Sequence, residues 1–109
     1  MIANSIREMS VATGLNQDEC LELYRIFFMG FDATILSMIE YSEQSDYQEI
    51  MKASHKLIGT FANIHLKELK DLSCKIEQCA KNQVDCLHLI EAVRRQGELL
   101  QKELLSIRE

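Results

Sequence analysis

The sequence predicts an all-α protein, built as an antiparallel up-down-up-down four-helix bundle with a short additional helix at the N-terminus. Proline is absent, glycine occurs four times, and fourteen leucines stand against six valines and threonines together. This composition favours long uninterrupted helices and disfavours turn-rich β folds. A chain of 109 residues with 47% hydrophobic residues suits one compact domain. We expect that domain over residues 1–109, with the bundle core at about 15–105.

The first predicted helix is short. Residues 5–8 (SIRE) have the spacing of a capping box, and Gly14 offers a stop. Apolar residues recur at helical intervals, at Ile2, Ile6 and Met9. We expect this helix to cap one end of the bundle.

The second predicted helix begins at residues 16–19 (NQDE), which also have the form of a helix start, and runs to about Tyr41. Its inward series is Cys20, Tyr24, Phe27, Phe31, Ile35 and Met38. Further apolar or small positions lie off this series, at Leu23, Ile26, Gly30 and Ala33. Either the first helix covers them or they form a docking surface for a partner that is continuous with the patch around His55, and we favour coverage by the first helix.

Three more amphipathic helices follow. The third begins at residues 45–48 (SDYQ) and ends near Asn63, with the inward set Ile50, Ala53, Leu57, Phe61 and Ile64. The fourth stops around residues 81–82, with the inward set Leu69, Leu72, Ile76, Cys79 and Ala80. The fifth has the inward set Cys86, Ile90, Val93, Gly97, Leu100 and Leu104. A link of about three residues between the last two makes them antiparallel neighbours.

His55 is expected on the solvent side of the third helix, because the inward set is centred roughly 150° away at about 100° per residue. Its own face carries Gln48, Met51, Lys52, Ile58, Gly59 and Ala62. The apolar members favour docking of a partner, and Gly59 leaves the approach to the imidazole open. A neutral imidazole is a nucleophile, and Lys52 could balance the charge of a phosphoryl group. From periodicity alone, an ordinary surface histidine is an equally good interpretation.

Residues 53–64 (ASHKLIGTFANI) resemble the signature of histidine-containing phosphotransfer (HPt) domains, a His-x-Leu-Lys-Gly core after a small residue. The resemblance covers about residues 15–105, including the aromatic-rich helix at 23–39, the acidic-aromatic start at 45–47, and Leu69, Leu72, Ile76 and Glu77 of the following helix. It implies a phosphorelay intermediate, in which Nε2 of His55 accepts a phosphoryl group from a phospho-aspartate and passes it to another aspartate. The implied partners are response-regulator receiver domains and a (hybrid) histidine kinase. The chain would be a phosphoryl carrier without turnover of its own and without a cofactor, because Mg²⁺ is expected only on the receiver.

Two positions depart from the pattern of the family. Ile58 stands where the family often has lysine, so Lys52 or Lys56 must take the electrostatic role, and Lys52 shares the face of His55. His65 stands where the family usually turns out of the helix at glycine. Ile58 motivates an alternative hypothesis, an HPt-like adaptor that binds a receiver domain or a histidine kinase without transferring phosphate.

Charge and hydropathy exclude several other functions. A net charge of -5 and a pI near 5.2 have the wrong sign for binding nucleic acid. No apolar run approaches the ~18 residues of a membrane span, and the N-terminus lacks a secretory signal. We therefore expect a cytoplasmic monomer with no nucleic acid and no membrane among its partners.

The four cysteines follow no metal-binding or disulfide pattern. Cys20, Cys79 and Cys86 fall on inward faces, whereas Cys74 projects outward. A bundle that binds a metal or cofactor through these cysteines with His65 or His88 is a third hypothesis, which we rank last. We predict no metal site.

Overall fold

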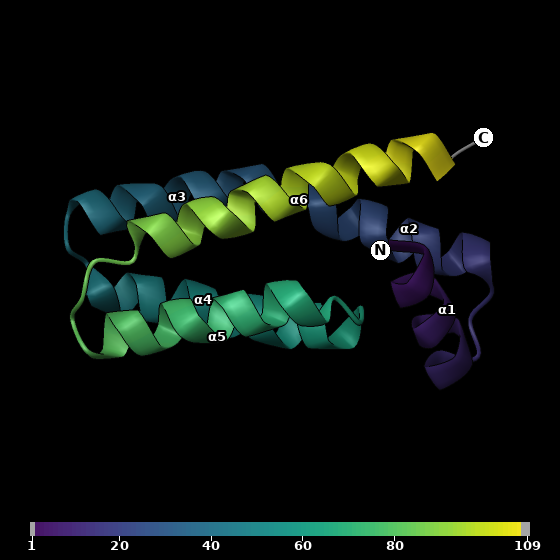
Figure 1. Cartoon of the computed structure of the whole chain (residues 1–109), viewed down its shortest axis with the longest axis horizontal. Helices are drawn as coiled ribbons and strands as arrows, with labels where there is room; N and C mark the ends of the chain where they lie inside the picture. Colours follow the sequence, from purple (N-terminus) through teal and green to yellow (C-terminus); the bar gives the residue numbers. More distant parts are fainter. Residues whose placement is uncertain (1, 108–109) are drawn as a thin grey trace.

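A computed structural model describes residues 2–107, which form α-helices joined by short connections and contain no strand (Figure 1). The helices are α1 (Ile2–Thr13), α2 (Gln17–Met29), α3 (Phe31–Glu43), α4 (Tyr47–Asn63), α5 (Lys67–Lys81) and α6 (Leu87–Ile107). The prediction of an all-α fold is confirmed. Met1 and residues 108–109, which the predicted domain includes, lie outside the described residues.

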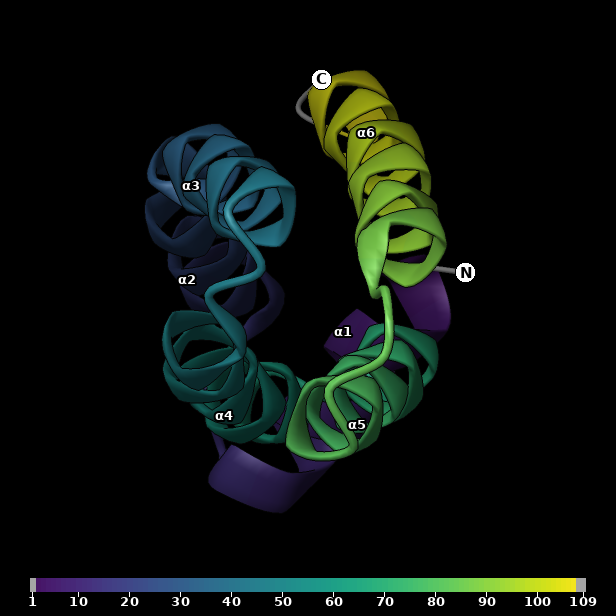
Figure 2. The ribbon, with the colours of Figure 1, turned by 90° about the vertical axis from the view of Figure 1, so that its left-hand side faces the viewer.

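Helices α3 to α6 form a bundle, which Figure 2 shows end on. α3 packs against α4 and α6, and α5 packs against the same two helices. The α3–α4 and α5–α6 connections lie at one end of the bundle and the α4–α5 connection at the other, so the chain reverses direction at each (Figure 1). The α5–α6 connection covers residues 82–86 and is longer than the link of about three residues that we expected.

The interior of the bundle is filled by the inward sets of the last three helices, together with Phe31, Ile35 and Met38 of α3. Buried positions are Ile50, Leu57, Phe61, Ile64, Leu69, Ile76, Ala80, Cys86, Ile90, Val93, Gly97, Leu100 and Leu104. Ala53, Leu72 and Cys79 are half-buried at its edge. Each large aliphatic side chain buried in this way stabilises the fold by about 1.5–3 kcal/mol.

The second predicted helix is divided, because α2 ends and α3 begins on either side of Gly30. The N–H of Gly30 donates to the carbonyls of Phe27 and Phe28 instead of continuing the regular ladder, and its φ and ψ are -103° and 0°. Glycine inside a helix costs about 1 kcal/mol relative to alanine, which makes this the weakest point of the segment. The expected start is confirmed, since Asn16 and Glu19 form a capping box. The expected end at about Tyr41 falls two residues short of Glu43.

α1 packs against α2 and α6, at the end of the bundle where α4 and α5 are joined (Figure 1). Its expected apolar residues Ile2, Ile6 and Met9 are buried. The expected capping box at residues 5–8 is wrong, because α1 already includes Ile2 and Ser5 is buried within it. Gly14 stops the helix as expected, at a φ of 78° that favours glycine.

The interpretation that α1 covers the extra apolar positions of the second predicted helix is wrong. Leu23 is 38% and Ile26 56% exposed, and Gly30 and Ala33 are also exposed. The buried face of α2 is formed instead by Cys20, Leu21, Tyr24 and Phe28. The outer face of α2 and α3 is therefore open to solvent.

Candidate functional site

Helix α4 carries His55 and is fixed at both ends. Asp46 caps its start by accepting a hydrogen bond from the N–H of Glu49 at 3.3 Å. At its end, His65 adopts the left-handed φ of 59°, a conformation more open to histidine than to branched residues. The buried hydroxyl of Tyr24 donates to the carbonyl of Ile64 at 2.5 Å. The helix therefore presents its solvent face from a firmly anchored position.

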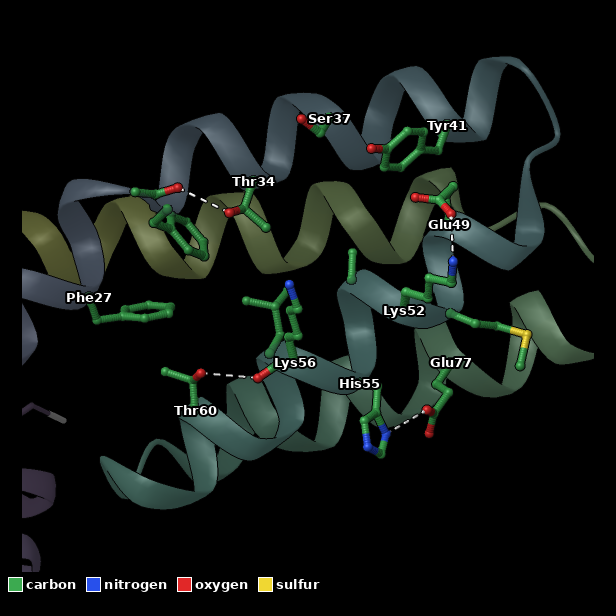
Figure 3. Close-up of a pocket in the computed structure, with 15 residues that line it drawn as sticks. Phe27, Thr34, Ser37, Tyr41, Glu49, Lys52, His55, Lys56, Thr60 and Glu77 are labelled. Atoms are coloured by element: carbon green, nitrogen blue, oxygen red, sulfur yellow. Dashed lines mark hydrogen bonds and ion pairs between the residues drawn. The ribbon is translucent and has the colours of Figure 1, made fainter.

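The imidazole of His55 is accessible and oriented. Its side chain is 80% exposed, which confirms the prediction that it faces solvent. Nδ1 lies 3.2 Å from Oε2 of Glu77, which extends from α5 (Figure 3). A carboxylate accepts and cannot donate, so in the neutral imidazole this contact favours the tautomer with the proton on Nδ1 and the lone pair on Nε2. Nε2 points away from Glu77, where a second molecule can reach it (Figure 3).

A groove of about 860 Å³ runs past His55 and extends across α4 to α3. We call it the His55 groove. Its walls come from the end of α2 and from α3, α4 and α5, and include Phe27, Gly30, Thr34, Ser37, Tyr41, Glu49, Met51, Lys52, Lys56, Thr60 and Glu77. The groove combines apolar walls with polar groups on α4, as a surface that docks a partner protein requires.

Two lysines line the His55 groove, and neither ammonium group points at the imidazole. Nζ of Lys52 pairs with Oε2 of Glu49 at 3.2 Å, and Lys56 extends toward Thr34 (Figure 3). The side chain of Lys52 is 67% exposed. An ion pair this exposed contributes little stability, so the ammonium can leave Glu49 for a nearby anion.

The other residues predicted beside His55 are divided between the groove and the open surface. Met51 is half-buried and lines the groove, and Ile58 is half-buried outside it. Gln48, Gly59 and Ala62 are exposed. A Cβ added at Gly59 would meet nothing within 4 Å, so the space beside the imidazole is open as expected.

Glu77 is the site residue that the sequence analysis missed. It lies 22 positions from His55 and on another helix. Helical periodicity relates only residues of the same helix, so it could not predict this contact. The sequence could have indicated Glu77 through its distance from the connection between the two helices. In two consecutive antiparallel helices, residues that are equally many positions before and after the connection lie side by side. The connection between α4 and α5 is centred near residue 65, which places Glu77 close to the level of His55.

The cysteines form no second centre. Cys20 and Cys86 are buried as expected, Cys79 is only half-buried, and Cys74, expected outside, is half-buried too. Burial raises the pKa of the Cys86 thiol to about 11 and also raises that of Cys20. Over residues 2–107, no group of three or more histidines, cysteines or acids is placed to hold a metal ion. Over the same residues, no helix has both the length and the apolar character to cross a membrane.

The fold and the groove together define a class of protein, a small helical bundle that presents an oriented, accessible imidazole on its surface. A comparison with protein families identifies that class more closely, because the model of the Hpt domain matches residues 22–109. The chain belongs to the Hpt domain family, the histidine phosphotransfer modules of two-component signalling. Members of this family are phosphoryl carriers that interact with receiver domains and histidine kinases. Comparisons with curated proteins and with solved structures gave no match.

Proposed function

We propose that the chain is a phosphorelay intermediate in which His55 is the phosphoacceptor. The observation that supports this most directly is the contact between Nδ1 of His55 and Glu77, together with the 80% exposure of the imidazole. Group transfer to a protein nucleophile needs a lone pair that is both free and held in one direction. His55 meets both conditions at Nε2.

The transfer step balances without an added base. The Nε2 lone pair attacks the phosphorus of a phospho-aspartate on a receiver domain, the N–P bond forms, and the P–O bond to the aspartate breaks. The aspartate leaves as a carboxylate with the bonding electron pair. The Nδ1 proton stays in place, so the ring gains a positive charge, and the Glu77 carboxylate at 3.2 Å offsets it. Return of the phosphoryl group to a second receiver reverses these changes.

The neighbouring charges and surfaces fit the same role. The transferred phosphoryl group is anionic, and Lys52 and Lys56 line the groove beside His55 where they can approach its oxygens. Mg²⁺ and the acidic pocket that holds it belong to the receiver domain in this proposal, and the chain needs no cofactor. Receiver domains and a (hybrid) histidine kinase in the cytoplasm would dock along the His55 groove, with Gln48, Met51, Ile58 and Ala62 around it and Gly59 giving clearance.

The test is phosphate uptake. The purified chain is incubated with a panel of receiver domains that carry labelled phospho-aspartate, and acid-labile, base-stable label is measured. Label is expected on the wild type and on His88→Gln, a matched control at an exposed histidine of α6, and is expected to be absent from His55→Gln. Label that persists on His55→Gln would overturn the assignment of the phosphoacceptor.

The same assay separates the proposal from the adaptor hypothesis that Ile58 motivates. Receiver binding is measured in parallel by calorimetry on the wild type and on His55→Gln. Binding to both proteins without label on either would identify a non-transferring adaptor and contradict the phosphorelay proposal.

A further inference from the structure

The outer face of α2 and α3 carries a row of apolar residues that no other part of residues 2–107 covers. Its members are Ile26, Met29, Ala33 and Leu36, and we call it the α2–α3 stripe. The three large side chains are 56%, 85% and 59% exposed, respectively. Their spacing of three, four and three residues is that of the a and d positions of a heptad, the seam along which one helix packs against another.

The stripe lies on a different face from the His55 groove. At about 100° per residue, it is nearly opposite the core-facing residues of the same helices, such as Phe31 and Ile35. The groove-lining residues Phe27 and Thr34 lie about 100° round the helix from Ile26 and Ala33. Figure 2 shows α3 between α4 and α6, with α2 behind it, and both α2 and α3 contact α6. A protein on the stripe would therefore leave His55 accessible.

The net charge of the whole chain resides on these two helices. Residues 17–43 contain six acidic residues and one basic residue, whereas the rest of the chain contains eleven of each sign. The acidic residues are Asp18, Glu19, Glu22, Asp32, Glu40 and Glu43. The single cation, Arg25, pairs with Glu22 at 3.3 Å. An apolar seam flanked by carboxylates attracts a partner of positive charge.

We propose that the α2–α3 stripe binds a basic amphipathic helix of a partner protein. Apolar residues of that helix would lie against Ile26, Met29 and Leu36, and its lysines or arginines would face Asp32 and Glu40. The small residue Ala33 lets a second helix backbone approach closely. The proposal adds a second binding surface to the chain and does not depend on phosphate transfer at His55.

A second copy of the chain is a poorer occupant of the stripe, for electrostatic reasons. Antiparallel self-pairing would match Ile26 with Leu36 and Met29 with Ala33, and its two-fold axis would bring Asp32 near its own counterpart. It would also place two segments of net charge -5 against each other. Like charges opposed across an interface disfavour association, so a complementary basic helix is preferred.

The probe is a synthetic peptide of about 21 residues, three heptads, with Leu at a and d and Lys at e and g. Its binding is followed by calorimetry, beside a scrambled peptide of the same composition and a twin with Glu in place of Lys. Only the patterned basic peptide is expected to bind saturably, and its affinity should fall as salt is raised. Equal binding of the scrambled peptide, or no binding of the basic one, would overturn the proposal.

Matched variants locate the site. Ile26→Ser combined with Leu36→Ser should weaken binding at least tenfold, whereas Leu99→Ser combined with Leu105→Ser, at exposed leucines of α6, should leave it unchanged. Asp32→Lys combined with Glu40→Lys should also weaken it. Circular dichroism checks that each variant is folded. If a double variant does not fold, the single variant Met29→Ser is measured in its place. An unchanged affinity in the stripe variants contradicts the proposal. Sedimentation that shows a dimer of the wild type, and a monomer of Leu36→Ser, also contradicts it, because a second copy of the chain would then occupy the stripe.

Discussion

Nδ1 of His55 on α4 and Oε2 of Glu77 on α5 lie 3.2 Å apart. The contact joins two neighbouring helices of the bundle at their solvent edge, where the histidine is 80% and the glutamate 34% exposed. Because Glu77 is the less exposed partner, its carboxylate acts as the fixed half of the pair and the imidazole as the half that it orients. In the proposed transfer Glu77 is thus a positioning residue, since it would act on the phosphoryl group only through His55.

Removal of Glu77 should slow phosphate transfer and leave the fold intact. Glu77→Ala loses both orientation and charge, and we expect roughly a tenfold lower rate, equivalent to about 1.4 kcal/mol in the barrier. Glu77→Gln keeps an acceptor oxygen but loses the charge. Its transfer rate should therefore lie between those of the wild type and Glu77→Ala. The measurement is single-turnover transfer from a phosphorylated receiver, with Glu91→Ala on α6 as the control.

Imidazole nitrogen shifts in NMR provide an independent readout of Glu77. The wild type should show mainly the Nδ1–H tautomer of His55, and Glu77→Ala should show a mixture. A wild-type tautomer distribution in Glu77→Ala together with a wild-type rate would remove Glu77 from the mechanism.

The parts of this fold that depend on one helix at a time could be predicted from the sequence. Periodicity placed His55 on the solvent face and Leu57 in the core, because both statements need only the helical repeat. Glu77 and the open outer face of α2 depend on how separate helices pack against each other. Periodicity along one helix does not show that Leu23 stays exposed or that the carboxylate of Glu77 reaches His55.

The interruption at Gly30 illustrates the same limit within a single segment. The apolar pattern continues through it, since Phe27 is half-buried and Phe31 buried on either side. The pattern therefore predicted one helix. The backbone leaves the regular ladder at the residue with the weakest helix propensity, a local effect that the apolar repeat does not encode.

Lys52 and Lys56 should contribute unequally to transfer. We expect Lys52→Ala to slow the reaction severalfold, because its exposed ammonium is free to turn from Glu49 to the phosphoryl group. Lys56 extends toward Thr34, and Lys56→Ala should have the smaller effect (Figure 3). Both rates come from the single-turnover assay, and the free energy of unfolding should change by less than about 0.5 kcal/mol. Wild-type kinetics in both variants would exclude the lysines from charge balance.

Two glycines should respond in opposite ways to the same substitution. A Cβ at Gly97 of α6 would collide with the buried ring of Phe31, so Gly97→Ala should destabilise the protein by about 1–3 kcal/mol. A Cβ at Gly59 meets open space, so Gly59→Ala should stabilise α4 by up to about 1 kcal/mol. Urea denaturation of both variants is the measurement. Equal stability of the two would contradict the close packing of α6 on Phe31.

A larger side chain at Gly59 tests the clearance around His55. Gly59→Leu should fold at least as stably as the wild type, since the site is exposed and leucine is a better helix former. It should nevertheless hinder the approach of a receiver domain and slow transfer, whereas Gly59→Ala should transfer almost normally. Undiminished transfer in Gly59→Leu would show that the receiver does not approach over this position.

Alkaline pH should destabilise the fold through three buried groups. Burial raises the pKa of the Cys86 thiol to about 11, and it also raises the pKa values of Cys20 and Tyr24. The unfolded chain loses these protons at lower pH than the folded chain, so it binds fewer protons and stability falls as pH rises. For Cys86 the fall lies between about pH 9 and about pH 11. Below this window the contribution is fully present.

The variant Cys86→Ser isolates one of these groups, because a serine hydroxyl does not titrate and can donate to the carbonyl of Val84 as the thiol does at 3.1 Å. The free energy of unfolding is measured in urea at about pH 8 and about pH 10.5. The decrease between the two should be smaller in Cys86→Ser than in the wild type, whatever the cost of the substitution itself. Between about pH 5 and pH 7 the thiols of Cys86 and Cys20 and the Tyr24 hydroxyl stay protonated in both the folded and the unfolded chain, and the two proteins should change in parallel. An equal alkaline decrease in both proteins would mean that the Cys86 thiol keeps its ordinary pKa despite its burial.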